Sequence, residues 1–160
     1  SATTSGMLLL PLLLSATLTT LISGRLISRT GRYKAFPIAG LALMSVGLLL
    51  LAGMDAQTSR TTASLFLVVF GLGFGMVSQV LTVAVQNAVA PRDIGVATGS
   101  ANLFRALGGS LGVAVFGALL ANHRDLVDAL HTIFLTAAPI AAAALLVTLF
   151  LREVPLRQAA

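Results

Sequence analysis

The sequence has little charge and no cysteine. Of its 160 residues only 9% are charged, whereas an ordinary globular domain has about 25%. Together with a hydrophobic content of 57% and a mean hydropathy of +0.98, this deficit excludes a soluble enzyme, a disordered chain and a coiled coil. The absence of cysteine excludes disulfides, thiolate metal sites and cysteine nucleophiles. The remaining class is a polytopic membrane protein, whose first expected partner is the lipid bilayer.

Acidic residues and histidines are also scarce, and we expect all of them outside the hydrocarbon. His123 and His131 fall in one predicted outer connection and lack the His-x-x-x-His or His-Glu spacing of a metal site. The acids lie in connections or at helix ends: Asp55, Asp93, Asp125, Asp128 and Glu153. We therefore expect no enzyme, no catalytic residues, no metal and no cofactor.

Long apolar runs predict five membrane-spanning helices. A helix needs about 20 apolar residues to cross roughly 30 Å of hydrocarbon. Runs of about that length predict spans at residues 1–24, 35–54, 61–90, 93–121 and 132–151. Asp93, which follows Pro91, is the expected N-cap of the fourth span, and Arg105 lies well inside it. The predicted fold is a single all-α integral membrane domain covering residues 1–160.

The connections between the spans differ in charge. The first carries Arg25, Arg29, Arg32 and Lys34, and the third connection and the tail are also basic, whereas the second is neutral and the fourth acidic. Since basic loops stay in the cytoplasm, these three segments are predicted to be cytoplasmic in a multi-pass protein of the inner (plasma) membrane. The net charge of +5 therefore orients the chain in the bilayer, and no nucleic-acid partner is expected.

Polar side chains within the spans cluster on particular helix faces. Gln79, Thr82 and Gln86 stand at i, i+3 and i+7 in the third span, and Asn102 and Arg105 stand at i and i+3 in the fourth. Intramembrane polar residues usually face the bundle interior or a water-filled cavity. These five residues are our candidates for a substrate path.

A further polar stripe, formed by Ser15, Thr19 and Ser23, lies in the first span, while spans two and five are nearly free of polar residues. We expect spans one, three and four to line an aqueous path and spans two and five to face lipid. Simpler interpretations stay open. Hydroxyls can bond their own helix backbone, amides can join neighbouring helices, and Arg105 can extend to the headgroups.

Glycine pairs at G-x-x-x-G spacing favour close helix packing, because they let two backbones touch where water cannot drive association. We assign this role to Gly71 and Gly75 in the third span and to Gly108 and Gly112 in the fourth.

The first connection resembles a loop that joins two helices in each half of the major facilitator superfamily. The family pattern is G-x-L-x-D-R-x-G-R-[RK], and this sequence departs from it at Ser28, where the stronger copy has an acid. The matching residues are Gly24, Leu26, Arg29, Gly31 and Arg32. By this resemblance Gly24, Arg25, Arg29, Gly31 and Arg32 form a cytoplasmic gating loop.

A second stretch, residues 86–112, resembles the fourteen-span drug:proton antiporters of that superfamily, the EmrB/QacA group. It contains Gln86-Asn87 before Pro91 and continues through Asn102-Leu103-Phe104-Arg105 into Gly108-Gly109-Ser110-Leu111-Gly112. The resemblance implies an incomplete carboxy-terminal six-helix bundle that lacks its first helix, in a fragment of a longer chain. It also implies alternating access, with protons exchanged for lipophilic, often cationic, small molecules.

The predicted function is therefore multidrug efflux, with the missing amino-terminal part of the transporter as a further partner. Two alternatives stay open: a facilitator-superfamily transporter of a metabolite, and a non-transporting membrane subunit with five spans.

Overall fold

The computed structural model describes residues 2–31, 33–55, 57–123 and 125–150, with side chains from residue 9 onward. Within these ranges five helices are long and apolar enough to cross a membrane, and no strand occurs. The predicted all-helical membrane fold is confirmed. The elements are α1 (Ala2–Thr30), α2 (Ala35–Ala52), α3 (Arg60–Ala88), the 3-10 turn η1 (Pro91–Asp93), α4 (Ile94–Asn122) and α5 (Leu126–Leu149).

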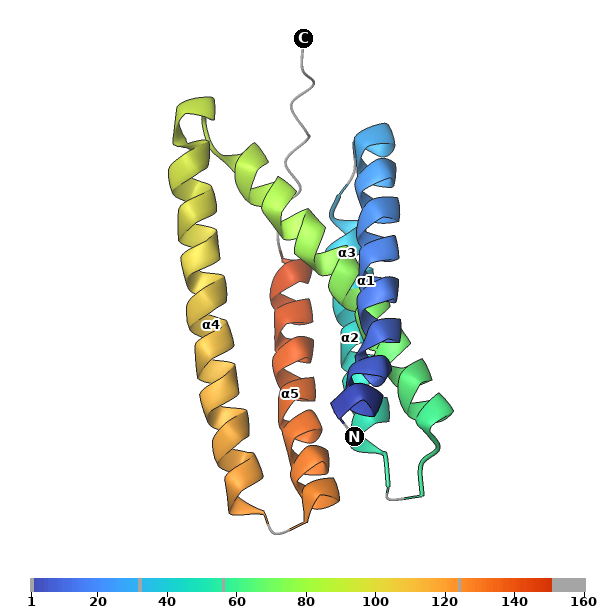
Figure 1. The fold of residues 1–160 in the computed structure, drawn as a ribbon. Coiled ribbons are helices and arrows are strands. Elements are labelled where there is room, and N and C mark those ends of the chain that lie inside the picture. Colours follow the sequence, from blue (N-terminus) through green and yellow to red (C-terminus); the bar gives the residue numbers. More distant parts are fainter. Residues whose placement is uncertain (1, 32, 56, 124, 151–160) are drawn as a thin grey trace.

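Alternate connections lie at the same end of the bundle, as successive membrane spans require (Figure 1). The α1–α2 and α3–α4 connections share one end, and the α2–α3 and α4–α5 connections share the other. The oblique helix α3 packs extensively against α1 and α2, and α2 also packs against α5. Helix α4 contacts α3 and α5 more sparsely and has no buried residue within the described part of the chain. Helix α4 therefore forms one edge of the bundle.

Two glycines of α3 let α1 approach its backbone closely. A side-chain carbon at Gly75 would fall on the backbone of Ala16, and one at Gly71 would fall on the hydroxyl of Ser15. The hydroxyl of Thr20 adds a hydrogen bond from α1 to the carbonyl oxygen of Gly75 at 3.2 Å. Gly71 and Gly75 thus lie where α1 and α3 touch, and their small size permits dispersion contacts between the two backbones.

Helix α2 lies between α3 and α5. A side-chain carbon at Gly40 of α2 would come within 2.7 Å of the carbonyl oxygen of Gly73 of α3. On another side of α2, Leu48 packs in a buried cluster with Ala138 and Ala141 of α5. Two sides of α2 therefore contact other helices, and the expectation that span two faces lipid stays a prediction for the rest of its surface.

The hydroxyl stripe of α1 is buried against α3 and does not line a path. Only 6% of Ser15, 5% of Thr19 and 1% of Ser23 remain exposed. Each hydroxyl donates to its own helix backbone: Ser15 to Leu12 at 2.9 Å, Thr19 to Ser15 at 2.7 Å and Ser23 to Thr20 at 3.1 Å. The path interpretation of this stripe is wrong, because the three side chains are buried and their hydroxyls bond their own helix backbone. Small residues of this kind allow tight helix packing.

Helices α1 and α5 extend beyond the predicted spans. Helix α1 continues to Thr30, where Gly31 adopts a left-handed conformation (φ 68°) and donates its N–H to the carbonyl of Ile27 at 2.9 Å. This arrangement is a common helix ending that glycine favours. Helix α5 begins six residues before the predicted span at 132, because the carboxylate of Asp125 accepts from the N–H of Val127 at 3.0 Å. His131 therefore lies in α5 and not in the connection.

Asp93 does not cap α4 with its side chain. Pro91 starts a 3-10 turn, in which the N–H of Asp93 bonds the carbonyl of Ala90 at 2.8 Å. Asp93 consequently has a helix-like backbone (φ −102°, ψ −1°) and not the extended one of a capping residue. Its carboxylate instead lies 3.5 Å from Nε of Arg92. The predicted cap is wrong because the 3-10 turn that starts at Pro91 includes Asp93 and leads directly into α4.

The α2–α3 connection is organised by hydrogen bonds to Asp55. Its carboxylate accepts from the hydroxyl of Thr58 at 2.8 Å and from the N–H of Gln57 at 3.0 Å. These bonds favour the charged form and lower the pKa of Asp55. The chain then enters α3 through Ser59, whose hydroxyl accepts from the N–H of Thr62 at 3.1 Å.

His123 joins the end of α4 to α5. Its Nδ1 lies 2.8 Å from the carbonyl of Leu119, and its Nε2 lies 3.3 Å from the hydroxyl of Thr132. The same hydroxyl is 2.9 Å from the carbonyl of Asp128. Because α4 has few other contacts with α5, the contacts of His123 help to hold this end of α4 against α5.

Replacing His123 by alanine is expected to lower the stability of the intact protein by about 1 kcal/mol, the usual contribution of one hydrogen bond. The melting temperature of the purified protein measures the change. His131→Ala is the matched control, because His131 is exposed on α5 and has no side-chain hydrogen bond in the described residues. Equal melting temperatures for the two variants would contradict the assigned role.

Candidate functional site

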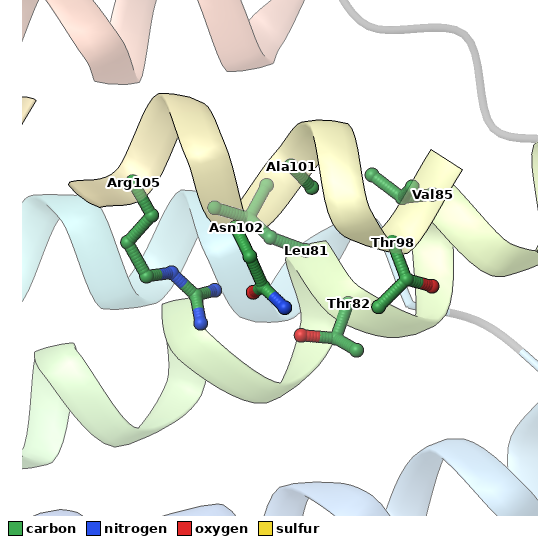
Figure 2. A pocket seen from close by; sticks show the side chains of 7 residues that line it. All are labelled: Leu81, Thr82, Val85, Thr98, Ala101, Asn102 and Arg105. Atoms are coloured by element: carbon green, nitrogen blue, oxygen red, sulfur yellow. The ribbon is translucent and has the colours of Figure 1, made fainter. Parts of the chain in front are cut away.

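A pocket of about 350 Å³ lies between α3 and α4. Its lining residues are Leu81, Thr82 and Val85 of α3 and Thr98, Ala101, Asn102 and Arg105 of α4. Figure 2 shows the side chains of Asn102 and Arg105 extending from α4 toward α3, with Thr82 facing them from the opposite helix. Three of the five predicted path residues thus come together between two helices that the sequence assigned to the path.

The pocket is mixed in character. Leu81, Val85 and Ala101 provide apolar walls, while the hydroxyls of Thr82 and Thr98, the amide of Asn102 and the guanidinium of Arg105 provide polar groups. Small-molecule sites in proteins are typically concave and mostly apolar, with a few polar groups that fix the orientation of the ligand. In size and chemistry this pocket suits a small amphipathic molecule.

The helices present these groups by simple periodicity. Thr98, Asn102 and Arg105 follow one another at i, i+4 and i+7, so that they share one face of α4. The hydroxyl of Thr82 is held by a hydrogen bond to the carbonyl of Ser78, one turn earlier on α3, at 3.3 Å. No proline interrupts α3 or α4. Two regular helices therefore hold the pocket residues in place.

The other two predicted path residues lie outside the pocket lining. Nε2 of Gln86 lies 3.5 Å from the hydroxyl of Thr98, a long hydrogen bond that connects α3 to α4 beside the pocket. Gln79 is half-buried on α3 and is absent from the lining. The amide of Gln86 therefore connects the two helices, and a role of Gln79 and Gln86 in a path stays a prediction.

Sequence reasoning missed four lining residues: Leu81, Val85, Thr98 and Ala101. Thr98 could have been found, because it extends the face of Asn102 and Arg105 by one turn. The three apolar residues carry no comparable signal in a sequence that is 57% hydrophobic, since only the position of the neighbouring helix shows which of them line a cavity.

The residues assigned to the gating loop lie mostly on helix α1 itself. Gly24, Arg25 and Arg29 belong to its last turns, where both arginine side chains are exposed, and Gly31 ends the helix. Arg32 lies outside the described residues. A gating role for these residues stays a prediction, with the refinement that most of the segment is a helix end and not a loop.

The glycines Gly108 and Gly112 of α4 do not touch the backbone of another helix in the described part of the chain, whereas those of α3 do. A side-chain carbon at Gly108 would meet nothing within 4 Å, and one at Gly112 would meet only Phe116 of the same helix. Within the described part of the chain, the G-x-x-x-G pair of α4 is therefore open. Its role in helix packing stays a prediction.

Comparisons with known proteins identify the family of the chain. The family model of the Major Facilitator Superfamily matches residues 1–160. An MFS-type transporter of Mycobacterium tuberculosis is 47% identical over 125 residues, which cover 78% of this chain and 18% of that protein. The multidrug transporter protein MdtP of Bacillus subtilis is 37% identical over 120 residues, covering 75% of this chain and 22% of the relative.

A tetracycline resistance determinant of Streptomyces rimosus is 34% identical over 132 residues, which cover 81% of this chain and 38% of that protein. The chain thus spans between 18% and 38% of the length of these three relatives. No solved structure matches the chain. The match over the whole chain shows that it belongs to the major facilitator superfamily of membrane transporters.

Proposed function

We propose that the chain is the carboxy-terminal part of a drug:proton antiporter of the fourteen-span EmrB/QacA group. The observation that carries this proposal is the pocket between α3 and α4, where Thr82, Asn102 and Arg105 meet apolar walls. A cavity with polar groups between spanning helices is the kind of site that facilitator transporters place near the midplane of the membrane. Relatives named as a multidrug transporter and a tetracycline resistance determinant support drugs as its substrates.

In the proposed transport cycle, the helices of this chain form one of two bundles that rock about the pocket. The tight glycine contacts of α3 with α1 and α2 favour movement of these three helices as one unit, because such contacts cannot slide without backbone overlap. Helix α4, with its sparse contacts, is suited to adjust against them. The pocket lies at the boundary between the packed helices and α4.

The proposed orientation places the α1–α2 and α3–α4 connections in the cytoplasm. Both lie at the same end of the bundle (Figure 1), and Arg25, Arg29 and Arg92 add positive charge there. Basic connections remain on the cytoplasmic side. The protein then resides in the inner (plasma) membrane with its carboxy terminus in the cytoplasm.

Proton coupling is proposed to involve the part of the transporter that precedes this chain. Coupling needs a titratable group within the membrane. The acids of the described residues lie in connections or near helix ends, and the pocket lining includes neither an acid nor a histidine. We therefore place the coupling carboxylate in the amino-terminal part.

The test is uptake of lipophilic compounds, with ethidium as one of the probes, into inverted membrane vesicles that contain the intact transporter and carry an imposed proton gradient. Gradient-dependent uptake of at least one such compound is expected, and collapse of the gradient should abolish it. Residues 1–160 expressed alone should give neither efflux nor drug resistance. Resistance in cells that make only this chain would contradict the proposal that proton coupling needs the amino-terminal part. An intact protein that moves a metabolite and no drug would favour metabolite transport.

A further inference from the structure

The charge of the pocket does not suit a cationic substrate. Its lining contains the guanidinium of Arg105, the amide of Asn102 and two hydroxyls, but no carboxylate. An ion pair joins Arg92 to Asp93 at the end of the bundle, away from the pocket. From the described lining, a cation in the pocket would meet one positive charge and no negative charge, which is unfavourable in a medium of low dielectric constant.

Arg105 is exposed on α4 but lies too far along the helix to be explained by a position at its end. It lies about 16 Å along α4 from Ile94, at about 1.5 Å per residue. Figure 2 shows its side chain extending from α4 toward α3. An arginine inside a membrane span generally requires a partner or water. Its orientation points to a partner within the pocket.

The neighbouring groups define the chemistry of that partner. A guanidinium binds a carboxylate through two parallel hydrogen bonds, a geometry that an ammonium group cannot reproduce. Asn102 and Thr98 on the same face of α4 can donate further hydrogen bonds to such a group. Leu81, Val85 and Ala101 provide apolar contact for the rest of the molecule.

We propose that the pocket binds amphipathic organic anions, in which a carboxylate pairs with Arg105 and an aromatic or aliphatic body fills the apolar part. This inference rests on the proposed function as a transporter and narrows its substrate class. It departs from the cationic compounds that the sequence resemblance implies. Arg105 could instead pair with an acidic side chain elsewhere in the intact transporter. The experiment below distinguishes a carboxylate of the substrate from a carboxylate of the protein.

The experiment measures uptake into inverted vesicles of three probes that share a naphthalene body. They are 1-naphthaleneacetate, its neutral amide and (1-naphthylmethyl)trimethylammonium. The intact transporter is compared with Arg105→Gln, Arg105→Lys and a matched control, Arg60→Gln, which removes an exposed arginine at the start of α3 away from the pocket. The melting temperature of each purified variant shows whether it is folded.

The original protein should transport the acid with a lower KM than the amide or the cation. Arg105→Gln should raise the KM for the acid about 10- to 100-fold, the range expected when a charge-assisted hydrogen-bonded pair is lost, and should leave the KM for the amide within about threefold. Arg105→Lys should show an intermediate KM for the acid. Arg60→Gln should match the original protein with every probe.

Two results would overturn the inference while leaving the transport function intact. One is proton-driven transport of the cation in preference to the acid. The other is an equal loss of all three probes in Arg105→Gln, which indicates pairing with an internal carboxylate. If the intact protein moves neither ethidium nor any naphthalene probe, the proposed function itself is wrong, and the inference falls with it.

Discussion

Gly75→Ala is expected to destabilise the intact transporter by about 2 kcal/mol or more, the range for inserting a methyl group into a well-packed core. The new carbon would fall on the carbonyl oxygen of Ala16 and within 3.1 Å of its carbonyl carbon. Since the contact is with backbone, a change of rotamer cannot relieve it, and α1 must move away from α3. That movement also disturbs the hydrogen bond from Thr20 to the carbonyl of Gly75.

The measurement is the melting temperature of the purified transporter in detergent. Gly117→Ala is the matched control, because the same methyl group at Gly117 of α4 meets nothing within 4 Å. A large decrease for Gly75→Ala and almost none for Gly117→Ala is expected. Similar changes in both variants would show that the loss of glycine itself, and not the α1–α3 contact, sets the stability.

The number of helices and their approximate positions follow from the sequence because hydrocarbon imposes a minimum apolar length. Their partners do not. The stripe of Ser15, Thr19 and Ser23 has the periodicity of a path-lining face, but it is buried against α3. Periodicity identifies a distinct helix face without showing whether that face meets water or another helix. The small size of all three residues was the signal for close packing.

Helix ends depend on local hydrogen bonds that hydropathy does not detect. Helix α5 starts at Leu126 because Asp125 caps it, although charged residues persist as far as Asp128. At α4, Pro91 produces a 3-10 turn that gives Asp93 a different backbone conformation from that of a cap. In both cases the apolar run gave the location of the span, and capping chemistry set the helix boundary.

The polar residues of the candidate site could be predicted from the sequence, but their neighbours could not. Thr82, Asn102 and Arg105 are polar in an apolar context, so the sequence distinguishes them, and the structure brings them into one pocket. Gln79 is equally polar but lies outside the lining. The difference depends on the path of α3 relative to α4, which the contacts of α3 with α1 and α2 determine.

Ala101→Trp is expected to reduce transport at least about 100-fold while leaving the protein folded, because the bulky ring would occupy the pocket between α3 and α4. Ala101 is half-buried and lines the cavity of about 350 Å³. Space is available for the indole ring, so the change should fill the cavity with little overpacking. The initial rate of uptake into inverted vesicles of the best-transported probe, normalised to transporter content, measures the loss.

Ala118→Trp provides the control for the added volume, since Ala118 is exposed on the same helix and absent from the lining. Its uptake rate should equal that of the original protein, and both variants should keep similar melting temperatures. Normal uptake by a folded Ala101→Trp variant would mean that substrate does not pass between α3 and α4. That result would remove the pocket from the transport path, because a filled cavity can neither bind a substrate nor release it.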